Sequence, residues 1–542
     1  MSVSINFISE QLSFHFTVDI DSKTAEMLFF WYNGPMLSKS KRTLFGLLYL
    51  VMLLLMVHWL YTSVMYLQEI SKIAIFIAVF LFLLAWLLRD RLKIAYVWLT
   101  QHKKGFLIGA VICQFVMMVC AELFIRRDAA VVFKGAFDLL KQSSITNYLS
   151  RNPNNIPLFL YEKFFYVIFG SSGLWVMQLL NILYVNLGAV LLYKLSQKHF
   201  SQKTADLAFV FYVSLICYSP YFYSMYTDIL PIPLITLQLW WVLDLLKADD
   251  AVISWKELLG LGVLSGVAML IRPTTIIVMI AFWAVLFFRG NWKSFGKIAM
   301  VTGLATGFVF AGLNTAVNHQ TVVPILKKEG LAKGPLLFIN LGLTDMGHNQ
   351  EDMKEGLLAY IDEDKRSDYN NGLFKKENVI KEIKRRLKEY GPWGLLGHIY
   401  YKQSLTVAEG TLGWLYRDVE YEKTPFINPL YAPLTKNNGL AKWVRTYFLS
   451  IDRPQYKYYE FVKQVIWIVL SAGLVGAYLK RRDTDAFNFL SLAVFGGLLF
   501  LTIFEGGKTR YLIQFLPQII LVASIGLAGF SKKVNTYKLS LV

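Results

Sequence analysis

Cysteine and charged residues are both scarce in this sequence, and each scarcity excludes a class of protein. Among 542 residues only three are cysteines, Cys113, Cys120 and Cys217. All three lie in apolar runs without metal-ligand spacing, so the sequence predicts neither a disulfide framework nor a zinc site. Charged residues make up 17% of the chain, against 55% hydrophobic residues. This balance excludes a string of soluble domains and indicates a polytopic membrane protein.

Acidic residues are also few, with 37 against 55 basic residues and a net charge of +18. In a soluble protein this excess would suggest a nucleic-acid partner. Here the basic residues stand in short clusters beside apolar runs, such as Lys39–Arg42, Arg89–Lys93 and Lys103–Lys104. Such clusters are typical of cytoplasmic loops under the positive-inside rule. We therefore expect a lipid bilayer around the protein and no nucleic-acid partner.

We expect no cleavable signal peptide, because the first apolar run begins near residue 44 and is too long for a signal-peptide core. We expect that run to remain as the first transmembrane helix. Residues 1–40 are polar to amphipathic, and Leu12–Ile20 alternates like a short strand. We expect a cytoplasmic N-terminal segment here. Asp19 and Asp21 resemble a metal-binding pair only as a string, and they would lie on the wrong face for a site at the outer membrane boundary.

Apolar runs near the 20 residues needed to span a bilayer core recur through the chain, and the charges between them keep a consistent sidedness. We expect about twelve crossings with both termini in the cytoplasm. The predicted fold class is an all-α polytopic membrane protein with a small mixed extracytoplasmic domain. The predicted organisation is 1–40 as the cytoplasmic segment, 41–104 as two extra N-terminal transmembrane helices, 105–313 as a transmembrane core with a first outer loop at 125–173, 314–460 as the extracytoplasmic domain and 461–542 as the C-terminal transmembrane helices.

Two apolar segments are expected to lie on the outer membrane interface rather than cross it. Residues 156–170 are short and carry Glu162 and Lys163 in their middle, while 390–417 are aromatic-rich with few charges. Both features are typical of interfacial helices. Pro273 must end the helix before it, since proline cannot donate the ladder hydrogen bond and restricts its predecessor.

Charged residues from loops far apart in the sequence gather at the predicted outer boundary of the membrane. Charges are costly at membrane depth unless paired or hydrated, so such a gathering is a site candidate. Carboxylates and guanidiniums on one face suit a substrate with an anionic group and a hydroxyl to be activated. Arginine is the better phosphate ligand, and a membrane-embedded phosphate suggests a polyprenyl-phosphate lipid. The candidates are Arg126, Arg127, Asp128, Asp138, Asp228, Arg272, Glu505, Lys508 and Arg510.

These features, taken in order, resemble the GT-C superfamily of integral membrane glycosyltransferases, which includes protein O-mannosyltransferases and aminoarabinose transferases. The matching stretches are Asp128–Ala136 for a D-x-x-x-Y/F-x-x-A motif, Asn152–Pro157 for a juxtamembrane Asn-Pro, Asp228 for a second outer aspartate, Gly260–Arg272 for a Gly-rich helix ending in a cation, and Arg510-Tyr511 before Pro517. The chain departs from the pattern by its two extra N-terminal helices and by Ala129, where many members have an acidic residue.

The resemblance implies an inverting sugar transfer from a polyprenyl-phosphate donor to an extracytoplasmic glycan, lipid or protein. It implies that Asp128 is the general base and Asp228 a second catalytic carboxylate. The lipid phosphate would be bound by Arg272 and Arg510 first, with Arg127 and Lys508 as further candidates. Arg126, Asp138 and Glu505 remain secondary candidates. No cofactor is assigned, and a divalent cation stays open because Ala129 departs from the motif.

Other interpretations of the same residues remain open. Asp128 could be a structural partner of its neighbouring arginines, and Arg272 or Arg510 could reach to the membrane interface as ordinary boundary residues. A transporter or flippase of a lipid-linked saccharide would also need many helices and an anionic-lipid site, but it predicts mid-membrane carboxylates and often repeated halves. A non-catalytic scaffold for envelope assembly is excluded by no residue.

Overall fold

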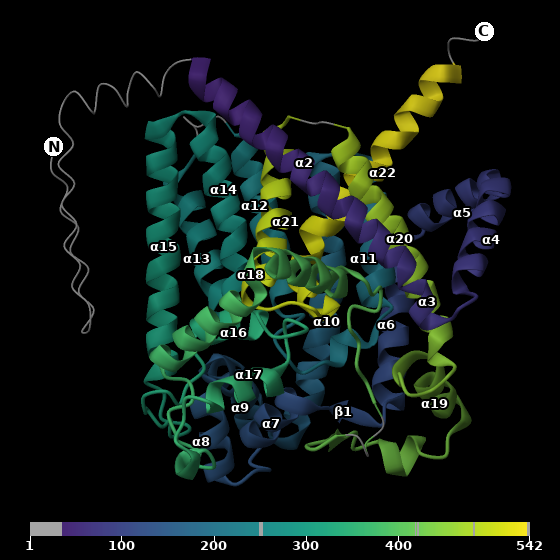
Figure 1. Ribbon diagram of the computed structural model, residues 1–542. Helices are drawn as coiled ribbons and strands as arrows, with labels where there is room; N and C mark the ends of the chain where they lie inside the picture. Colours follow the sequence, from purple (N-terminus) through teal and green to yellow (C-terminus); the bar gives the residue numbers. More distant parts are fainter. Residues whose placement is uncertain (1–34, 249–252, 418, 420–421, 481–482, 539–542) are drawn as a thin grey trace, which may run out of the picture.

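The computed structural model describes residues 35–248, 253–417, 419, 422–480 and 483–538, and these form an almost entirely helical molecule (Figure 1). The predicted segment 1–40 therefore lies outside the described residues except for 35–40, which begin the first helix. The helices are α2 Pro35–Met65, α3 Leu67–Ile70, α4 Ala74–Leu87, α5 Arg89–Gln101, α6 Lys103–Cys120, α7 Arg127–Ala136, α8 Gln142–Arg151, α9 Ile156–Phe169, α10 Gly173–His199, α11 Gln202–Tyr212, α12 Pro231–Lys247, α13 Trp255–Ile271, α14 Ile276–Arg289, α15 Trp292–Asn318, α16 Pro335–Gly342, α17 Gln350–Leu358, α18 Lys376–Val407, α19 Gly439–Val444, α20 Tyr456–Leu479, α21 Asp485–Phe504 and α22 Leu516–Lys538. The strands β1 Leu123–Ile125 and β2 Phe426–Ile427 pair antiparallel.

Within these described ranges, seven helical segments are long and apolar enough to cross a bilayer. They are Lys41–Ile70, Lys103–Cys120, Pro153–His199, Trp292–Asn318, Tyr456–Leu479, Asp485–Phe504 and Thr509–Gly529. The predicted all-α polytopic membrane protein is thereby confirmed. The remaining apolar helices α4, α12, α13 and α14 have 14 to 17 residues. At 1.5 Å per residue they are shorter than the roughly 30 Å hydrocarbon core, although α12 to α14 stand beside α15 in the bundle (Figure 1).

Small residues let α13 and α15 pack closely. A Cβ placed on Gly262 would lie 2.5 Å from the Cβ of Ala305, and one on Gly266 would lie 2.7 Å from that of Val309. Thr306 Oγ1 also donates to the Gly262 carbonyl at 3.2 Å. Close backbone approach through small residues is how helices associate in lipid. The pairing leaves the opposite face of α15 uncovered.

A π-helical turn at Val213–Cys217 breaks the end of α11. The carbonyls that this turn frees are bonded by side chains of other helices, since a bare carbonyl is costly in a membrane. Lys463 of α20 donates to the carbonyls of Ser214 and Tyr218, the latter at 2.9 Å, and Gln114 of α6 donates to that of Cys217 at 2.8 Å. The chain that follows this turn leads to Asp228.

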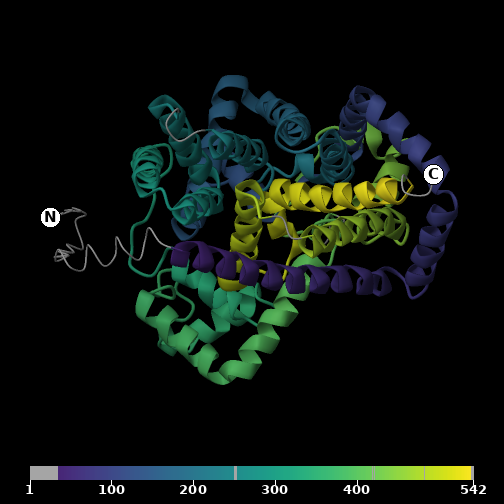
Figure 2. The same cartoon turned by 90° about the horizontal axis from the view of Figure 1, so that it is seen from above.

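Residues 121–172 and the described residues of 319–455 form a layer at one end of the bundle. In Figure 2 the α16–α18 part of this layer stands to one side of the bundle. The β1–β2 pair joins the two halves of this layer, and Asn428 Nδ2 donates to the carbonyls of Met118 and Ala121 at 3.0 and 2.9 Å. Among the described residues of 314–460, the predicted mixed domain, the structure is mostly helical. Its strand β2 pairs with β1 in the only sheet of the described residues.

Two segments predicted to be interfacial have the exposed apolar faces that such a position requires. Helix α9 ends at Gly170, whose φ of 57° turns the chain into α10, and it exposes Val167 and Ile168. Helix α18 is interrupted at Gly391, and Trp393 just beyond is 84% exposed. Their depth in the membrane stays a prediction.

Candidate active site

Asp228 is buried at the centre of an ionic cluster built from three segments of the chain. Its side chain is 2% exposed, and its Oδ2 accepts a hydrogen bond from Arg510 Nε at 2.7 Å and lies 2.6 Å from Arg510 Nη2. Arg272 Nη1 lies 3.6 Å from Oδ1. A buried carboxylate held by two guanidiniums is stable as an anion, because charge-assisted bonds offset its loss of water. The structure thus brings together three residues that the sequence predicted only to share a boundary.

Arg272 is fixed in this cluster by two further hydrogen bonds. Its Nη1 donates to Thr227 Oγ1 at 2.8 Å and its Nε to Gln514 Oε1 at 3.2 Å. Gln514 also accepts from Thr274 and donates to the Tyr511 carbonyl at 3.0 Å. These contacts join the turn at the end of α13 to the 3₁₀ segment Thr509–Phe515 before α22. They fix the orientation of the Arg272 guanidinium and therefore of its second terminal nitrogen.

Asp128 lies in the first turn of α7 and is exposed. The neighbouring Arg126 turns away from it, because its Nε donates to Glu422 Oε2 at 2.7 Å. Arg127 adopts a φ of 54°, a strained conformation for a side-chain-bearing residue. No ion pair to Asp128 occurs in the part of the chain that the structure describes; its bonded neighbour is the hydroxyl of Tyr148. The alternative in which Asp128 pairs with its own arginines is therefore absent from this geometry.

A chain of hydrogen bonds runs from Asp128 to Tyr226, and Arg510, which contacts the Tyr226 ring, completes the connection to Asp228. The Tyr148 hydroxyl accepts from Asn155 Nδ2 at 2.8 Å, and Tyr226 Oη donates to Asn155 Oδ1 at 3.2 Å. Arg510 lies over the Tyr226 ring, 5.2 Å from its centroid. Burial first, and then the charge of Asp128, raise the pKa of Tyr226 to about 12. The bridge therefore stays protonated and able to donate at neutral pH.

Sequence reasoning missed Tyr148, Asn155, Tyr226, Gln514 and Lys333 as members of this site. Two of them lie in stretches that carry the motif resemblance: Asn155 in the Asn-Pro segment and Tyr226 two residues before Asp228. Tyr148, Gln514 and Lys333 carry no pattern that separates them from other polar residues. Only the packing of α8, the loop before α16 and the segment Thr509–Phe515 shows their role.

Cations outnumber acids around this cluster. Burial and the nearby Arg126 lower the pKa of Arg127, and burial and Arg127 lower the pKa of Lys508. Burial also lowers the pKa of Lys333, against the opposing influence of Asp128. Cations that disfavour one another's charge in this way bind an added anion favourably. Glu505 is hydrogen-bonded by the Tyr511 hydroxyl, and burial raises its pKa.

Asp138 stands apart from the cluster. It is 58% exposed and accepts from Lys163 Nζ at 2.7 Å, at the end of α7. The other eight sequence candidates lie near the Asp228 cluster or at the end of β1 that supports Asp128. Asp138 lies on the surface.

A half-buried acidic pair, Glu409 and Glu460, adjoins the cluster on another side. Glu409 accepts hydrogen bonds from Thr411 and from the Gly413 backbone, and Glu460 accepts from Tyr66 Oη at 3.0 Å. Burial, with Glu460 as the second cause, raises the pKa of Glu409 to about 8. Gly413 itself has a φ of 67°, and a Cβ there would lie 3.0 Å from the backbone nitrogen of Arg510.

The residues of the cluster do not fit a bound divalent cation. A metal site needs several converging carboxylate or imidazole ligands, but Asp228 is already paired with Arg510 and Arg272. No group of three or more His, Cys, Asp or Glu that could hold a metal occurs among the described residues. The donor set of this cluster suits an anion instead.

The chain matches one family model and is similar in fold to a few solved structures. The family model described as a conserved hypothetical integral membrane protein matches residues 37–529. No curated protein matches the chain significantly. Among solved structures the chain is similar to the archaeal oligosaccharyltransferase AglB from Archaeoglobus fulgidus, in complex with an inhibitory peptide and a dolichol-phosphate, at 13% identity and a TM-score of 0.38. This match covers 82% of the chain but about half, 52%, of the archaeal protein.

The chain is also similar to ArnT from Cupriavidus metallidurans. The structure bound to undecaprenyl phosphate matches at 12% identity and a TM-score of 0.33, over 78% of this chain and 77% of that one. The apo structure matches at 12% identity and a TM-score of 0.30, over 78% and 76%.

Proposed function

The chain belongs to the family of conserved hypothetical integral membrane proteins, and from its site we propose that it is a membrane glycosyltransferase. In this proposal it moves a sugar from a polyprenyl-phosphate donor to the hydroxyl of an extracytoplasmic acceptor, with inversion. One observation carries the proposal: two aspartates lie in different environments beside an excess of cations. Asp228 is ion-paired, Asp128 has no ion pair within the described residues, and the hydrogen bonds from Asp128 lead to Tyr226, whose ring contacts Arg510.

The Arg510 and Arg272 guanidiniums are the proposed binding site for the donor phosphate. Asp228 and Gln514 hold one edge of these groups, and the second terminal nitrogen of each guanidinium makes no hydrogen bond within the described residues. These free N–H groups suit the oxygens of a phosphate. As the bond between the anomeric carbon and the phosphate oxygen breaks, the growing negative charge on the phosphate is stabilised by the same cations. In this proposal Asp228 acts by orienting the guanidiniums of Arg272 and Arg510.

Asp128 is the proposed general base. The acceptor oxygen attacks the anomeric carbon, its proton passes to the Asp128 carboxylate, and the polyprenyl phosphate leaves as the anion. Tyr148 donates to the carboxylate and so fixes its direction. Asp128 is exposed and has no ion pair in the described residues, so its oxygens are open to an acceptor hydroxyl, whereas those of Asp228 are occupied by guanidiniums. Two carboxylates with separate environments can therefore divide the two roles.

Native mass spectrometry of the detergent-purified protein tests this proposal and requires no assumption about which sugar is transferred. We expect wild type to carry a polyprenyl phosphate. The amount of this lipid that co-purifies should fall at least about tenfold in Arg272→Ala, as removal of a charge-assisted hydrogen bond predicts. Asp128→Asn should keep the lipid and accumulate its sugar-bearing form, because only the transfer step is blocked. Asp138→Asn, a matched change at a surface ion pair, should behave as wild type. The proposal fails if Arg272→Ala retains the lipid or if Asp128→Asn transfers sugar normally.

A further inference from the structure

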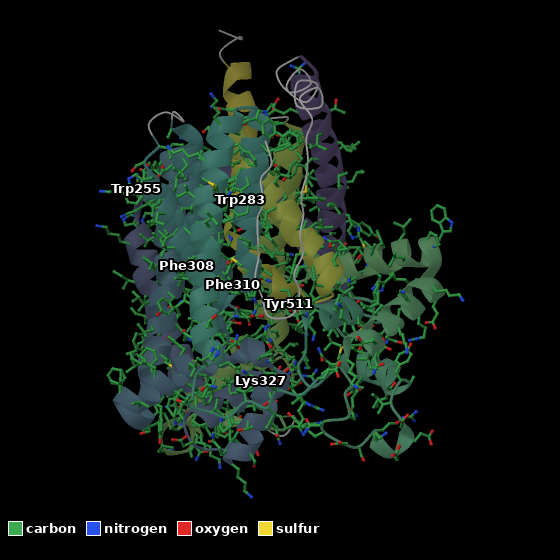
Figure 3. The ribbon with its side chains drawn as sticks, turned by 90° about the vertical axis from the view of Figure 1, so that its left-hand side faces the viewer. Trp255, Trp283, Phe308, Phe310, Lys327 and Tyr511 are labelled. Atoms are coloured by element: carbon green, nitrogen blue, oxygen red, sulfur yellow. The ribbon has the colours of Figure 1, made fainter. Side chains whose placement is uncertain are left out.

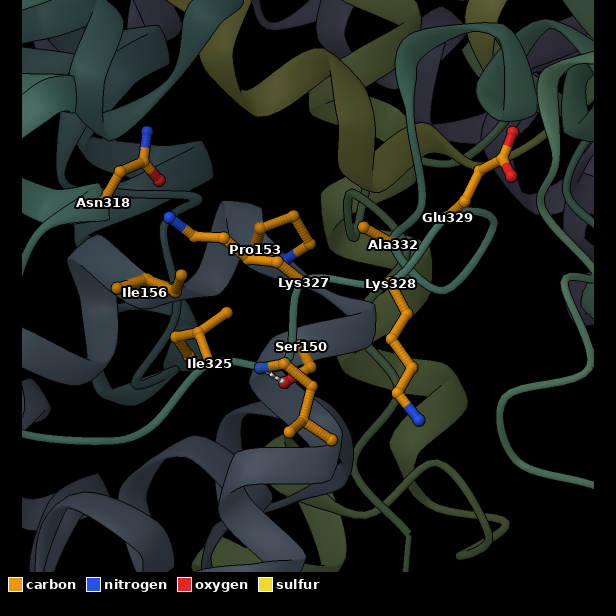
Figure 4. Close-up of a pocket in the computed structure, with 10 residues that line it drawn as sticks. Ser150, Pro153, Ile156, Asn318, Ile325, Lys327, Lys328, Glu329 and Ala332 are labelled. Carbon is orange, nitrogen blue, oxygen red and sulfur yellow. Dashed lines mark hydrogen bonds between the residues drawn. The ribbon is translucent and has the colours of Figure 1, made fainter.

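A cavity of about 370 Å³ opens between the end of α15 and the α8–α9 junction (Figure 4). Its floor is apolar, formed by Pro153, Ile156 and Ile325, and its rim carries Asn318 and Lys327. In Figure 4 the Lys327 side chain runs across the mouth toward Asn318, while Lys328 points away. An apolar floor with a cation at the rim suits a molecule that is itself part apolar and part anionic.

The charge at this rim is not cancelled by its neighbours. Glu329, the one acidic residue that lines the cavity, lies 3.8 Å from Lys375 Nζ and so has a cation of its own. Lys327 forms no ion pair within the described parts of the chain. An ammonium with an open partner position at an apolar cavity attracts an anion, with an energy that grows as water is excluded.

The cavity lies at the end of an exposed apolar helix face. α15 is a candidate membrane span, and its uncovered face exposes Met300, Leu304 and Phe308 at 60%, 67% and 83%. Asn318 is its last residue, so the cavity begins where this apolar face ends. Figure 3 shows Phe308 on that face above Lys327. A lipid beside α15 would therefore bring its headgroup to the rim.

The cavity adjoins the Asp128 half of the site rather than the half that holds the guanidiniums of Arg272 and Arg510. Ser150 lines it and receives the Leu326 backbone N–H at 2.8 Å; the same helix α8 carries Tyr148, the partner of Asp128. The loop that forms its other wall continues to Lys333, which interacts electrostatically with Asp128. The proposed base acts on the acceptor hydroxyl, so a molecule bound here is placed on the acceptor side.

We infer that the cavity binds the acceptor and that the acceptor is a phosphate-bearing lipid with a free hydroxyl, which enters from the bilayer along α15. This inference rests on the proposed function for the acceptor role. Lys327 contacts the lipid phosphate, the floor at Ile156 and Ile325 covers the first part of the lipid, and the hydroxyl points toward Asp128. Phosphatidylglycerol has this chemistry and serves as the probe.

Binding is measured on the full chain in nanodiscs of phosphatidylcholine with added phosphatidylglycerol, followed by native mass spectrometry of retained lipid. Lys327→Glu, which reverses the rim charge, and Ala332→Trp, which fills the cavity, should each lower retained phosphatidylglycerol by at least about tenfold. Lys354→Glu makes the same charge change on exposed α17 and should have no effect. Polyprenyl phosphate should stay bound in all three variants.

Equal retention of phosphatidylglycerol in Lys327→Glu and Lys354→Glu overturns the inference, as does equal binding of phosphatidylcholine to wild type. Loss of polyprenyl phosphate in Lys327→Glu overturns it in another way, since the cavity would then belong to the donor. If Lys327→Glu and Ala332→Trp lose phosphatidylglycerol but Arg272→Ala keeps polyprenyl phosphate, the lipid site in the cavity is supported. The proposed donor-phosphate site at Arg272 and Arg510 is then wrong.

Discussion

Replacing Asp228 with asparagine tests the ionic cluster at its centre. The change keeps the shape of the side chain but removes the charge that holds Arg510 and Arg272. Breaking one partner of a buried ion pair costs about 3–5 kcal/mol, because the other charge is left uncompensated. The Arg510 side chain is 30% exposed, and the amide oxygen can still accept one bond. We therefore expect a loss near the low end of that range, about 3 kcal/mol in the free energy of unfolding.

The assay is unfolding of the purified protein in mixed micelles of dodecyl maltoside and SDS, with Asp138→Asn as the matched control. Asp138 is 58% exposed in its ion pair with Lys163, and exposed pairs contribute about 0–1 kcal/mol. A difference between the two variants below about 1 kcal/mol would contradict the view that Asp228 is a buried anion held by arginines.

A double-mutant cycle separates this pair from general damage. Asp228→Asn and Arg510→Gln should each destabilise the protein, and the double variant should lose less than their sum by about 1.5 kcal/mol or more. Strict additivity would show that the two side chains do not interact as their 2.6 and 2.7 Å contacts indicate.

Three further outcomes follow from other parts of the structure. Lys463→Met should raise deuterium uptake several-fold in the π-helical turn whose carbonyls Lys463 bonds, while Lys457→Met, at the exposed start of the same helix, should leave uptake unchanged. Glu409 has a raised pKa of about 8, so its contribution to stability is complete below the unfolded pKa of about 4.5 and is lost as the pH rises toward 8. Between these two pH values, wild type should therefore lose stability relative to Glu409→Gln. Parallel plots of unfolding free energy against pH for the two proteins would contradict this. Gly413→Ala should destabilise by about 1 kcal/mol or more, since alanine is strained at a φ of 67° and would crowd Arg510, whereas Gly439→Ala meets open space and should be neutral within about 0.5 kcal/mol.

The sequence was enough to predict the seven helices that are long and apolar enough to cross a bilayer, because their signal is local, while the expected total of about twelve crossings stays a prediction. An apolar run of about 20 residues, such as Trp292–Asn318, indicates its own length and environment. The shared position of Asp228, Arg272 and Arg510 was also predictable, since each follows or precedes such a run and the topology puts their ends on one boundary. The sidedness of that boundary, the position of the termini and the roles of the residues stay predictions.

The rest depended on contacts that leave no local pattern. Arg126 is a neighbour of Asp128 in the sequence, yet its partner Glu422 lies 296 residues away. Val213–Cys217 has the sequence of a regular apolar helix, and the extra residue that makes it a π turn is visible only in the hydrogen bonds. The bridge through Asn155 needs three segments of the chain to be placed before its members can be recognised.

The long separation between the partners in this site has a consequence for synthesis of the chain. Arg126 meets Glu422 only 296 residues later, and Asp228 meets Arg510 only 282 residues later. At about 5–20 residues per second, each half of the site waits roughly 15–60 s on the ribosome before its partner exists. During that interval Asp228 has Arg272 but lacks Arg510, the guanidinium that makes its shorter contacts. Chains truncated before Arg510 should therefore be stronger substrates for membrane quality-control proteases than the full chain, because the segment Thr509–Phe515 supplies the last partner of the cluster.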